Sequence, residues 1–387
     1  MKRKMAYMTL NGAIPSRKAN GVGVMNTCSE FAQRDLDVEL ILPRGHVGPP
    51  RRLLRGESIW DFYSVPRNFR VSYLPCPKFG SSLTNGVYSV LAMSYAALKC
   101  KDLIYSRHIE LAYVAALYGK MSVFESHNYL KVSQRPILSD WIGMLRNPRR
   151  PVAMVVTTEA AARAYEAKGV PAERIRVAPN GVALKRFTFS GSKESMRKSI
   201  GLPIEKTVVG FSGHLYRGRG IERLLECAKL LDQVFFLIVG GEPADILRNK
   251  SFAQDLGLSN VKFAGFVPQA NMPNYLFACD ILVMPYTEAT LTHNYMSPMK
   301  MFEYLATGRP IVATDFPVIR EVLVDKRNSV LVPSNSADAL AWGIKWIMEH
   351  PKDAKRLAEK ARREAEQYSW ENRVKCVISW FGDWFGL

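Results

Sequence analysis

The segment SPMKMFEYLATGRPIVATD (residues 297–315) puts a lysine and a glutamate beside a predicted helix N-terminus. Ser297 can cap a helix, and Pro298 suits the first helical position, where its missing N–H leaves no hydrogen bond unmade. A helix N-terminus attracts anions, so Lys300 and Glu303 would lie beside a site for a phosphate or another anion. The alternative is an ordinary capped helix in which both charged residues are structural.

A second segment, GFSGHLYRGRGIERLL (residues 210–225), has the pattern of a strand, a glycine-rich loop and a helix. Gly213 and the two later glycines let a ligand approach the backbone, while Arg217 and Arg219 bring positive charge to a helix N-terminus. This combination suits a diphosphate. An ordinary turn with solvated arginines remains the alternative, because glycine-rich loops are common.

Short, continuously apolar segments alternate with amphipathic helical patterns along the chain. Strands of this kind are buried on both faces, which is typical of parallel sheets covered by helices. The expected strands are residues 38–42, 102–106, 121–126, 153–158, 174–179, 207–213, 234–241, 261–266, 280–286, 310–315 and 329–333.

This number of strand–helix units favours two doubly wound sheets over one. We place the boundary in the turn-rich stretch 179–187, with a first domain at residues 1–180 and a second at 181–368. Residues 369–387 are expected to form a C-terminal helix that needs a surface to cover, and the first domain is one candidate. Its helically spaced apolar positions are Trp370, Val374, Ile378 and Trp380.

The composition of the 387-residue chain, 48% hydrophobic and 23% charged, indicates a globular protein. The six cysteines include no Cys-x-x-Cys pair, so we expect buried free thiols in a reducing compartment and no zinc site. The N-terminal apolar run is too short for a signal peptide, and residues 79–98 are too polar for a membrane span. We interpret 79–98 as a loop leading into a packed helix. A cytoplasmic protein, in solution or on the membrane surface, is expected.

The net charge of +18 is concentrated in the first half of the chain. Residues 1–190 contain 28 of the 53 Lys and Arg residues but 13 of the 35 Asp and Glu residues, and therefore carry +15. Candidate partners are an anionic lipid surface, a lipid phosphate, an acidic polysaccharide or nucleic acid. Nucleic acid is not expected, because no RNA-binding or helix-turn-helix signature is present.

Several of these segments together resemble one enzyme family. Residues 297–315 closely resemble the donor-site motif of family 4 of the retaining glycosyltransferases, which are GT-B enzymes that use nucleotide sugars. GHLYRGRG is similar to the family's glycine-basic loop, and VKFAGFVPQ to its base-binding segment. In the first half, IPSRKANGVGV (14–24) resembles the acceptor-side loop and VFESHN the Glu-x-His segment. The likeness covers nearly the whole chain and is stronger in the C-terminal half.

The resemblance implies an α/β fold of GT-B type, with two Rossmann-like doubly wound parallel-sheet domains facing a cleft. It implies that Glu303 accepts hydrogen bonds from the ribose hydroxyls, which suits a carboxylate. Arg219 takes the place of the basic residue that neutralises the diphosphate, Lys300 assists, and His127 lies near the donor sugar. The implied donor-binding residues are Gly213, His214, Arg219, Phe266, Val267, Ser297, Lys300 and Glu303, and the acceptor-side residues are Lys18, Asn20, Gly21 and Tyr295.

Two positions depart from the family pattern. Tyr295 stands eight residues before Glu303, where the family often has a first glutamate, and His214 stands where arginine is usual. Tyrosine can hydrogen-bond sugar hydroxyls but carries no charge, and a histidine supports a diphosphate fully only when protonated. A catalytically weak or silent nucleotide-sugar-binding protein is therefore the alternative to an active enzyme.

The implied reaction is transfer of a sugar from a UDP- or GDP-linked donor to an acceptor hydroxyl, with retention of the anomeric configuration. Arg219, Lys300, the helix dipole and His214 when protonated would stabilise the departing diphosphate, so no metal and no other cofactor are expected. The family suggests the leaving phosphate as acceptor of the hydroxyl proton. The sequence agrees, since the Asp-x-Asp at residues 35–37 lies between a helix pattern and a strand rather than in a loop.

The basic first domain favours a lipid-linked or otherwise anionic acceptor in cell-envelope polysaccharide or glycolipid synthesis. Two basic segments, residues 49–57 and 140–151, combine arginines with apolar residues and suit an anionic membrane face. The alternative for 140–151 is a buried helix face followed by a solvated arginine turn.

Overall fold

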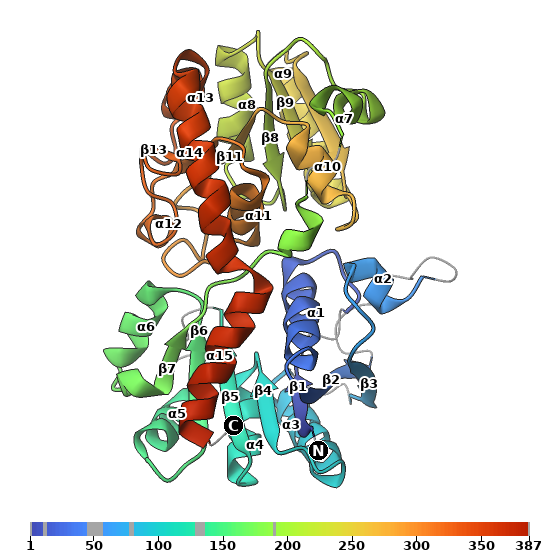
Figure 1. The fold of residues 1–387 in the computed structure, drawn as a ribbon, viewed down its shortest axis with the longest axis vertical. Helices are drawn as coiled ribbons and strands as arrows, with labels where there is room; N and C mark the ends of the chain where they lie inside the picture. The colour runs from blue at the N-terminus through green and yellow to red at the C-terminus, as the bar shows by residue number, and fades with distance from the viewer. Residues whose placement is uncertain are drawn as a thin grey trace. The chain divides into compact units, whose positions relative to one another are not determined.

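The computed structural model describes residues 2–10, 14–44, 57–76, 81–127, 136–188 and 191–385. The chain divides into two compact units, one formed by Met1–Asn180 with Trp370–Leu387 and the other by Gly181–Ser369 (Figure 1). Each unit contains a parallel sheet between helices. The α/β class with two Rossmann-like sheets, predicted from the alternating pattern, is confirmed.

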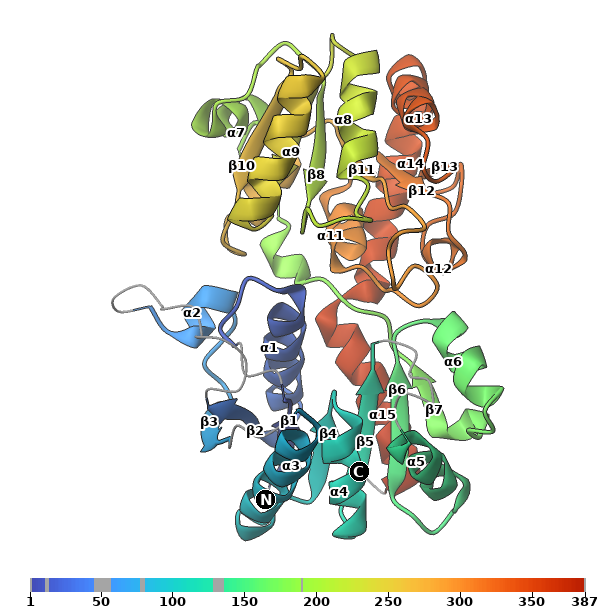
Figure 2. The ribbon, with the colours of Figure 1, turned by 180° about the vertical axis from the view of Figure 1, so that it is seen from behind.

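In the first unit, the described residues form a seven-stranded parallel sheet of order β3-β2-β1-β4-β5-β6-β7. Helices α1 and α15 contact each other on one face of this sheet, and α3, α4 and α5 form a second group on the other (Figures 1 and 2). The strands are β1 (Arg3–Met8), β2 (Leu36–Arg44), β3 (Arg70–Pro75), β4 (Leu103–Ser106), β5 (Met121–Ser126), β6 (Val152–Val156) and β7 (Ile175–Val177). The helices are α1 (Ala19–Ala32), α2 (Ile59–Tyr63), α3 (Ser81–Leu98), α4 (Ile109–Leu117), α5 (Ile137–Arg146), α6 (Glu159–Glu166), η2 (Ala172–Arg174) and α15 (Trp370–Phe385).

The second unit contains, within the described residues, a six-stranded parallel sheet of order β10-β9-β8-β11-β12-β13. Helix α8 contacts α9 and α13 on one face, whereas α10 contacts α7 and α11 on the other (Figures 1 and 2). The strands are β8 (Val208–Ser212), β9 (Phe235–Val239), β10 (Val261–Gly265), β11 (Ile281–Met284), β12 (Ile311–Thr314) and β13 (Val330–Val332). The helices are η3 (Leu184–Arg186), α7 (Lys193–Ile200), α8 (Ile221–Leu230), α9 (Pro243–Asp255), α10 (Met272–Phe277), α11 (Met299–Thr307), α12 (Pro317–Arg320), α13 (Ala337–Glu349), α14 (Pro351–Glu364) and η4 (Ala365–Tyr368).

Both sheets reverse their strand order at one point, between β1 and β4 in the first unit and between β8 and β11 in the second. In sheets of this kind, the loops that leave the two central strands diverge to opposite faces at such a point. Open α/β sheets bind ligands at this place. The residues that follow β1, β4, β8 and β11 are therefore the first candidates for a ligand site.

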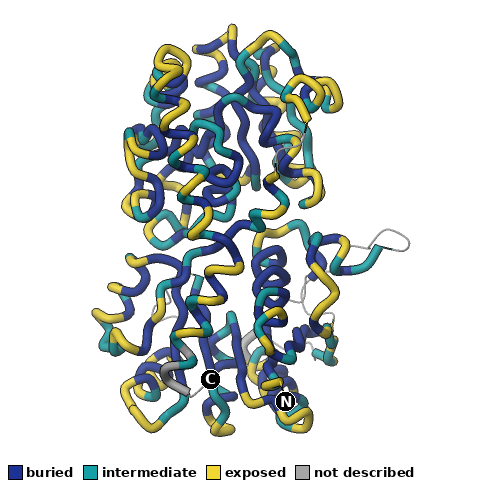
Figure 3. Tube along the Cα trace, in the orientation of Figure 1, coloured by how far each residue is buried: buried dark blue, intermediate teal, exposed yellow. Residues whose placement is uncertain are grey.

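The central strands of both sheets are buried, as Figure 3 shows. Helix α5 contributes to this core, since Trp141, Ile142 and Leu145 are all at most 5% exposed. The interpretation of residues 140–151 as a membrane face is wrong for these side chains, because they pack inward. Arg146, the last residue of α5, donates from Nε to the carbonyl of Gly169 over 2.8 Å. Of the other basic segment, 49–57, only Glu57 lies within the described residues.

Helix α3 differs from the expectation for residues 79–98. Residues 79 and 80 lie outside the described part of the chain, and the helix already includes Ser81, where a loop was expected. One face packs into the core, but its other face leaves large apolar side chains at least 44% exposed, namely Leu83, Val90, Leu91 and Leu98. The described part of the chain contains no helix that is both long and apolar enough to cross a membrane.

Two strands were missed by the sequence patterns. Strand β1 begins with Arg3 and Lys4, and β3 has exposed or half-buried positions throughout, so neither reads as a continuous apolar run. The expected free thiols are present, although only Cys28, Cys227 and Cys279 are buried.

The C-terminal helix α15 belongs to the first unit and contacts α1. Trp370 and Val374 are at most 3% exposed, while Ile378 and Trp380 are half-buried. Arg373 is also buried, and its Nε donates to the carbonyl oxygen of Pro179 over 3.0 Å. The helix thus has an apolar face with one buried arginine in it.

The loop between β8 and α8 requires a glycine at position 220. Gly220 has φ of +76°, and a Cβ atom there would lie 1.5 Å from the carbonyl oxygen of Pro285, which follows β11. The missing side chain therefore lets the loop after β8 lie directly against the loop after β11.

We expect Gly220→Ala to lower the free energy of unfolding by at least about 3 kcal/mol, because left-handed strain and backbone overlap add together. Gly257→Ala is the matched control: its φ is +71° but a Cβ atom would meet nothing within 4 Å. It should lose only about 1–2 kcal/mol. Urea unfolding of both variants measures the difference, and equal losses would show that the contact with Pro285 carries no constraint.

Candidate functional site

The carboxyl end of β8 brings a glycine next to the ammonium group of Lys300. Gly213 follows the strand with φ of +130°, and its N–H donates to the carbonyl of Val239 over 2.9 Å. A Cβ atom at this glycine would lie 2.9 Å from Lys300 Nζ. Any side chain at position 213 would therefore displace the lysine.

Lys300 is the second residue of α11 and is 9% exposed. Its Nζ atom lies 3.6 Å from the ring centroid of Phe211 and 5.3 Å from that of Tyr286, and has no hydrogen-bond partner among the described residues. Burial, reinforced by the charge of Arg219 and opposed by Glu303, holds the pKa of Lys300 well below its usual value. An anion bound here would supply the missing partner.

Arg219 stands on the loop between β8 and α8. Its guanidinium carbon lies 4.6 Å from the ring centroid of Tyr216 and 5.2 Å from that of Tyr286, and an Nη group donates to the Tyr216 hydroxyl. Its Nε has no hydrogen-bond partner within the described residues. Thr290 fixes the loop by donating from Oγ1 to the carbonyl of Gly218 over 2.5 Å. The arginine is thus held between two aromatic rings.

The N-terminus of α11 lies one residue later than predicted. The helix begins at Met299, so Pro298 rather than Ser297 occupies the N-cap position, and Pro298 provides no side-chain cap. The predicted stop is confirmed, because Gly308 takes the left-handed C-cap conformation with φ of +62°. The hydroxyl of Tyr304 accepts the backbone N–H of Ser212 over 2.8 Å and so ties α11 to the end of β8.

Glu303 lies one turn into α11 and is half-buried. Burial raises the pKa of its carboxyl group, although the nearby charges of Arg186 and Lys300 act to lower it. Arg186 stands on η3, at the start of the second unit. The sequence patterns did not single out Arg186, because a lone arginine in a 3₁₀ turn has no recognisable motif.

The remaining predicted donor residues also follow strands of the second sheet. His214 comes after β8, half-buried, with its ring 5.4 Å from that of Tyr216. Phe266 and Val267 come directly after β10, the first half-buried and the second 5% exposed. The structure therefore brings all eight predicted donor residues to one edge of the sheet. Tyr295, grouped with the acceptor side, is half-buried in the loop before α11 of this same unit.

At the carboxyl edge of the first sheet, His127 directly follows β5 and its Nε2 contacts Oε1 of Glu125 and an Nη group of Arg107. Glu125 is 2% exposed and receives the hydroxyl hydrogen of Tyr105. Burial and the charge of Arg107 lower the pKa of His127 to about 4, so its ring is neutral at pH 7.

The predicted acceptor-side loop lies at the same edge. Arg107 donates from Nη1 to Asn20 Oδ1 over 2.5 Å, which links the start of α1 to the end of β4. A Cβ atom at Gly21 would lie 2.2 Å from the Tyr63 hydroxyl, whereas Lys18 is exposed. Asn20 and His127 thus share Arg107 as a neighbour, a contact that the sequence could not reveal because the three residues are far apart along the chain.

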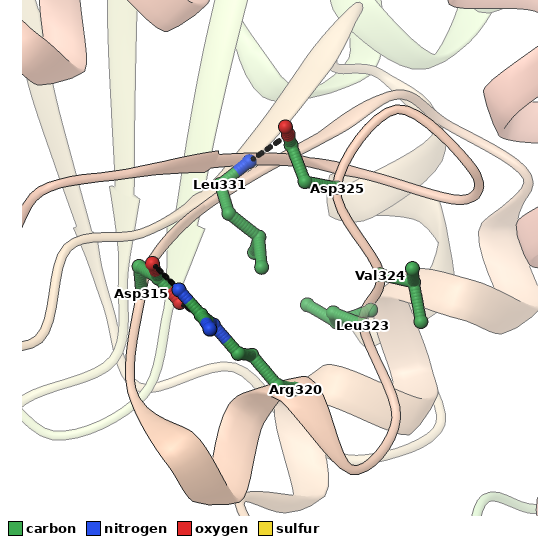
Figure 4. Close-up of a pocket in the computed structure, with 6 residues that line it drawn as sticks. All are labelled: Asp315, Arg320, Leu323, Val324, Asp325 and Leu331. Atoms are coloured by element: carbon green, nitrogen blue, oxygen red, sulfur yellow. Dashed lines mark hydrogen bonds and ion pairs between the residues drawn. The ribbon is translucent and has the colours of Figure 1, made fainter.

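A separate pocket of about 320 Å³ lies beside α12 (Figure 4). Arg320 forms an ion pair with Asp315, and Asp325 accepts the backbone N–H of Leu331 over 2.9 Å. Because these polar groups are paired, the pocket lacks the unpartnered charge that distinguishes the edge of β8. No group of three or more His, Cys, Asp or Glu side chains suited to a metal ion occurs in the described residues.

Sequence comparisons match the two halves of the chain to two family profiles. Residues 21–186 match the family described as Glycosyltransferase Family 4, and residues 192–364 match Glycosyl transferases group 1. A putative teichuronic acid biosynthesis glycosyltransferase, TuaC of Bacillus subtilis, is 26% identical over 88% of each chain.

A D-inositol 3-phosphate glycosyltransferase of Corynebacterium urealyticum is 28% identical over 53% of this chain. The chain spans about half the length of this relative. Among solved structures, HepE of Anabaena in complex with UDP is similar, with a TM-score of 0.75, 18% identity and coverage of 98% of this chain and all of the other. This likeness shows a shared fold.

The lowered pKa of the buried Lys300 predicts a pH-dependent stability difference between the protein and Lys300→Met. Between the lowered pKa of the folded state and the unfolded value of about 10.5, the unfolded chain binds the extra proton. The stability of the unsubstituted protein should therefore rise with pH relative to Lys300→Met, by up to about 1.4 kcal/mol per pH unit. Urea unfolding at several pH values between 7 and 10 would measure it.

The exposed Lys229 on α8 provides the control for this experiment. Lys229→Met should differ from the unsubstituted protein by the same amount at every pH in this range. Parallel behaviour of Lys300→Met would contradict the buried, unpartnered state of Lys300.

Proposed function

We propose that this chain, a glycosyltransferase whose two halves match the family 4 and group 1 profiles, moves a sugar from a nucleoside diphosphate to an acceptor hydroxyl with retention of configuration. The observation that carries the proposal is the ammonium of Lys300. It is buried and unpartnered among the described residues, beside an uncapped helix N-terminus and within the field of Arg219.

A diphosphate would satisfy each of these groups at once. Its negative charge would pair with Lys300 and Arg219, and backbone N–H groups at the start of α11 would donate to its oxygens. The aromatic rings of Phe211 and Tyr286 keep water from the lysine, which strengthens its attraction to an anion.

Glu303 is proposed to bind the ribose of the nucleotide. It lies on α11 one turn after Lys300, and a carboxylate can accept hydrogen bonds from two neighbouring hydroxyls. Phe266 and Val267, after β10, would contact the base through their backbone groups. UDP is bound by HepE, and this supports a nucleoside diphosphate as the ligand class here. The donor would be linked to either UDP or GDP.

In the proposed reaction the bond between the anomeric carbon and the diphosphate breaks, and the acceptor oxygen forms a new bond to that carbon on the same face. Lys300, Arg219 and the helix dipole stabilise the charge that develops on the diphosphate, so we propose that the transfer needs no metal. Neutral His127 hydrogen-bonds the transferred sugar. The departing phosphate is proposed to take the proton of the acceptor hydroxyl, as the resemblance to the family suggests.

The acceptor is proposed to be a lipid-linked or other anionic molecule in the synthesis of cell-envelope polysaccharide or glycolipid. The excess of basic residues in the first half of the chain supports an anionic acceptor. The likeness to TuaC supports polysaccharide synthesis. The exposed apolar face of α3 supports contact of a cytoplasmic protein with the anionic inner membrane surface.

The alternative, a nucleotide-sugar-binding protein with weak or no activity, is favoured by Tyr295 and His214, which replace two charged residues of the family pattern. A screen of UDP- and GDP-sugars with membrane lipids, followed by release of nucleoside diphosphate, separates the two. Turnover that needs both donor and acceptor supports the transferase. Donor binding with no turnover on any acceptor supports the alternative, and the absence of both would overturn the donor site.

Turnover should persist in EDTA, because Lys300, Arg219 and the helix N-terminus supply the positive charge that a metal supplies elsewhere. The assay compares initial rates with and without the chelator and after adding magnesium. A loss in EDTA that magnesium restores would contradict this mechanism.

Glu303→Gln keeps the shape of the side chain but removes the charge that strengthens its hydrogen bonds. We expect nucleoside diphosphate to bind with a Kd roughly 10- to 100-fold higher, corresponding to about 1.5–3 kcal/mol. Calorimetric titration measures it, with the exposed Glu349→Gln on α13 as control. A Kd for Glu303→Gln equal to that of the control would mean that Glu303 does not hold the ribose.

A further inference from the structure

Arg373, on the C-terminal helix α15, lies beside the carboxylate of Glu125, which precedes His127 in the sequence. Arg373 Nη2, on α15, lies 3.1 Å from Oε1 of Glu125, on β5. Each of the two side chains is 2% exposed. The pair is therefore a buried contact within the first unit between segments almost 250 positions apart in the sequence.

Basic side chains surround one carboxylate oxygen of Glu125. Its Oε1 atom faces Arg373, the Nε of Arg107 at 3.5 Å and the Nε2 of His127, while Tyr105 donates to Oε2. Neither Nη group of Arg373 is aligned for a hydrogen bond within the described residues, so its contact with Glu125 is an ion pair. A buried carboxylate with two guanidinium groups is fully compensated, and Glu125 is too enclosed to react with a substrate itself.

Two contacts hold the guanidinium group of Arg373 beside Glu125. Its Nε donates to the carbonyl of Pro179 over 3.0 Å, and its guanidinium carbon lies 5.8 Å from the ring centroid of Trp370 on the same helix. Trp370 is 3% exposed. The position of the guanidinium group thus depends on the packing of α15 against the first unit.

The charge around His127 depends on Arg373. The ring shares its Nε2 side with Glu125 and Arg107, and this atom can either donate to the carboxylate or accept from the guanidinium group, not both. With both arginines in place the surroundings carry a net charge of about +1, which disfavours the imidazolium form. Without Arg373 the net charge would be near zero, and Glu125 would favour protonation of the ring.

We propose that Arg373 is a positioning residue, which holds Glu125 as a compensated carboxylate and thereby favours the neutral form of the His127 ring in which Nε2–H is donated to Glu125. Nδ1 then remains an acceptor for a substrate hydroxyl. Burial and the charge of Arg107, with a smaller contribution from Arg373, lower the pKa of His127, which agrees with this arrangement. The titratable and charged groups that face Glu125 and His127 in the described structure are Arg107, Arg373, Tyr105, Tyr7 and Cys28.

The test is nitrogen NMR of the full-length protein with labelled histidine, with His127→Asn identifying the signal. In Arg373→Met, the pKa of His127 should rise by about one unit or more. Arg373→Lys, which keeps the charge, should return the pKa of His127 most of the way to its value in the unsubstituted protein. Lys375→Met, an exposed change on the same helix, is the control and should leave the titration unchanged. A folded Arg373→Met protein with an unchanged His127 titration would overturn the proposal.

A second variant keeps the test decisive if Arg373→Met does not fold. In Glu125→Gln the anionic acceptor is gone, so the Nε2–H tautomer should lose its preference and the nitrogen shifts should move towards the other tautomer. Unchanged shifts would again overturn the proposal.

The consequence for sugar transfer rests on the proposed function, whereas the NMR titration does not. In Arg373→Met, the rate of turnover should acquire a loss at low pH that follows the raised pKa of His127, while Kd for nucleoside diphosphate stays the same. A changed titration without a changed pH profile would support the effect of Arg373 on His127 but refute the role of His127 in transfer.

Discussion

The carboxyl edge of the second sheet is built around the buried side-chain amino group of Lys300, which has no hydrogen-bond partner in the described structure. Lys300 can occupy its position only because Gly213 has no side chain and because Phe211 and Tyr286 accept a cation against their ring faces. Tyr304 holds α11 at the end of β8, and Gly220 lets the loop carrying Arg219 lie against Pro285. A group that is costly to bury is thus surrounded by residues that fix it in place, as expected for a ligand site.

The first unit also buries a charged side chain, but there the neighbouring side chains of opposite charge compensate it. There the buried charge is the carboxylate of Glu125, and Arg107, Arg373 and His127 surround it, so this site is compensated without any ligand. The cluster of the second unit lies where the strand order reverses, between β8 and β11, whereas the cluster of the first unit lies at the ends of β4 and β5, beside the reversal in its own sheet. We therefore propose that one edge binds an anion, while the other edge carries a histidine that is neutral at pH 7.

The sequence predicted the elements that repeat a simple pattern. The alternation of apolar segments with helical patterns predicted the two parallel sheets, and Gly308 predicted the end of α11. Both predictions succeeded because these features depend on residues close together in the sequence. Strand β1 was missed since it opens with Arg3 and Lys4, and the apolar residues of α5 were open to a membrane interpretation because burial depends on tertiary packing. The approach of Arg373 to Glu125 has no local signature at all. The resemblance identified the eight candidate donor residues in the sequence, and the fold brings them to one edge of the second sheet.

The central claim is that the carboxyl edge of the second sheet binds a nucleoside diphosphate through Lys300 and Arg219. The most direct measurement is a crystal structure of the protein grown with UDP and, separately, with GDP. The account predicts, for the nucleotide that binds, phosphate oxygens within hydrogen-bonding distance of Lys300 Nζ and of the first backbone N–H groups of α11, with the ribose hydroxyls on Glu303. A nucleotide bound elsewhere, with Lys300 still lacking a partner, would contradict it.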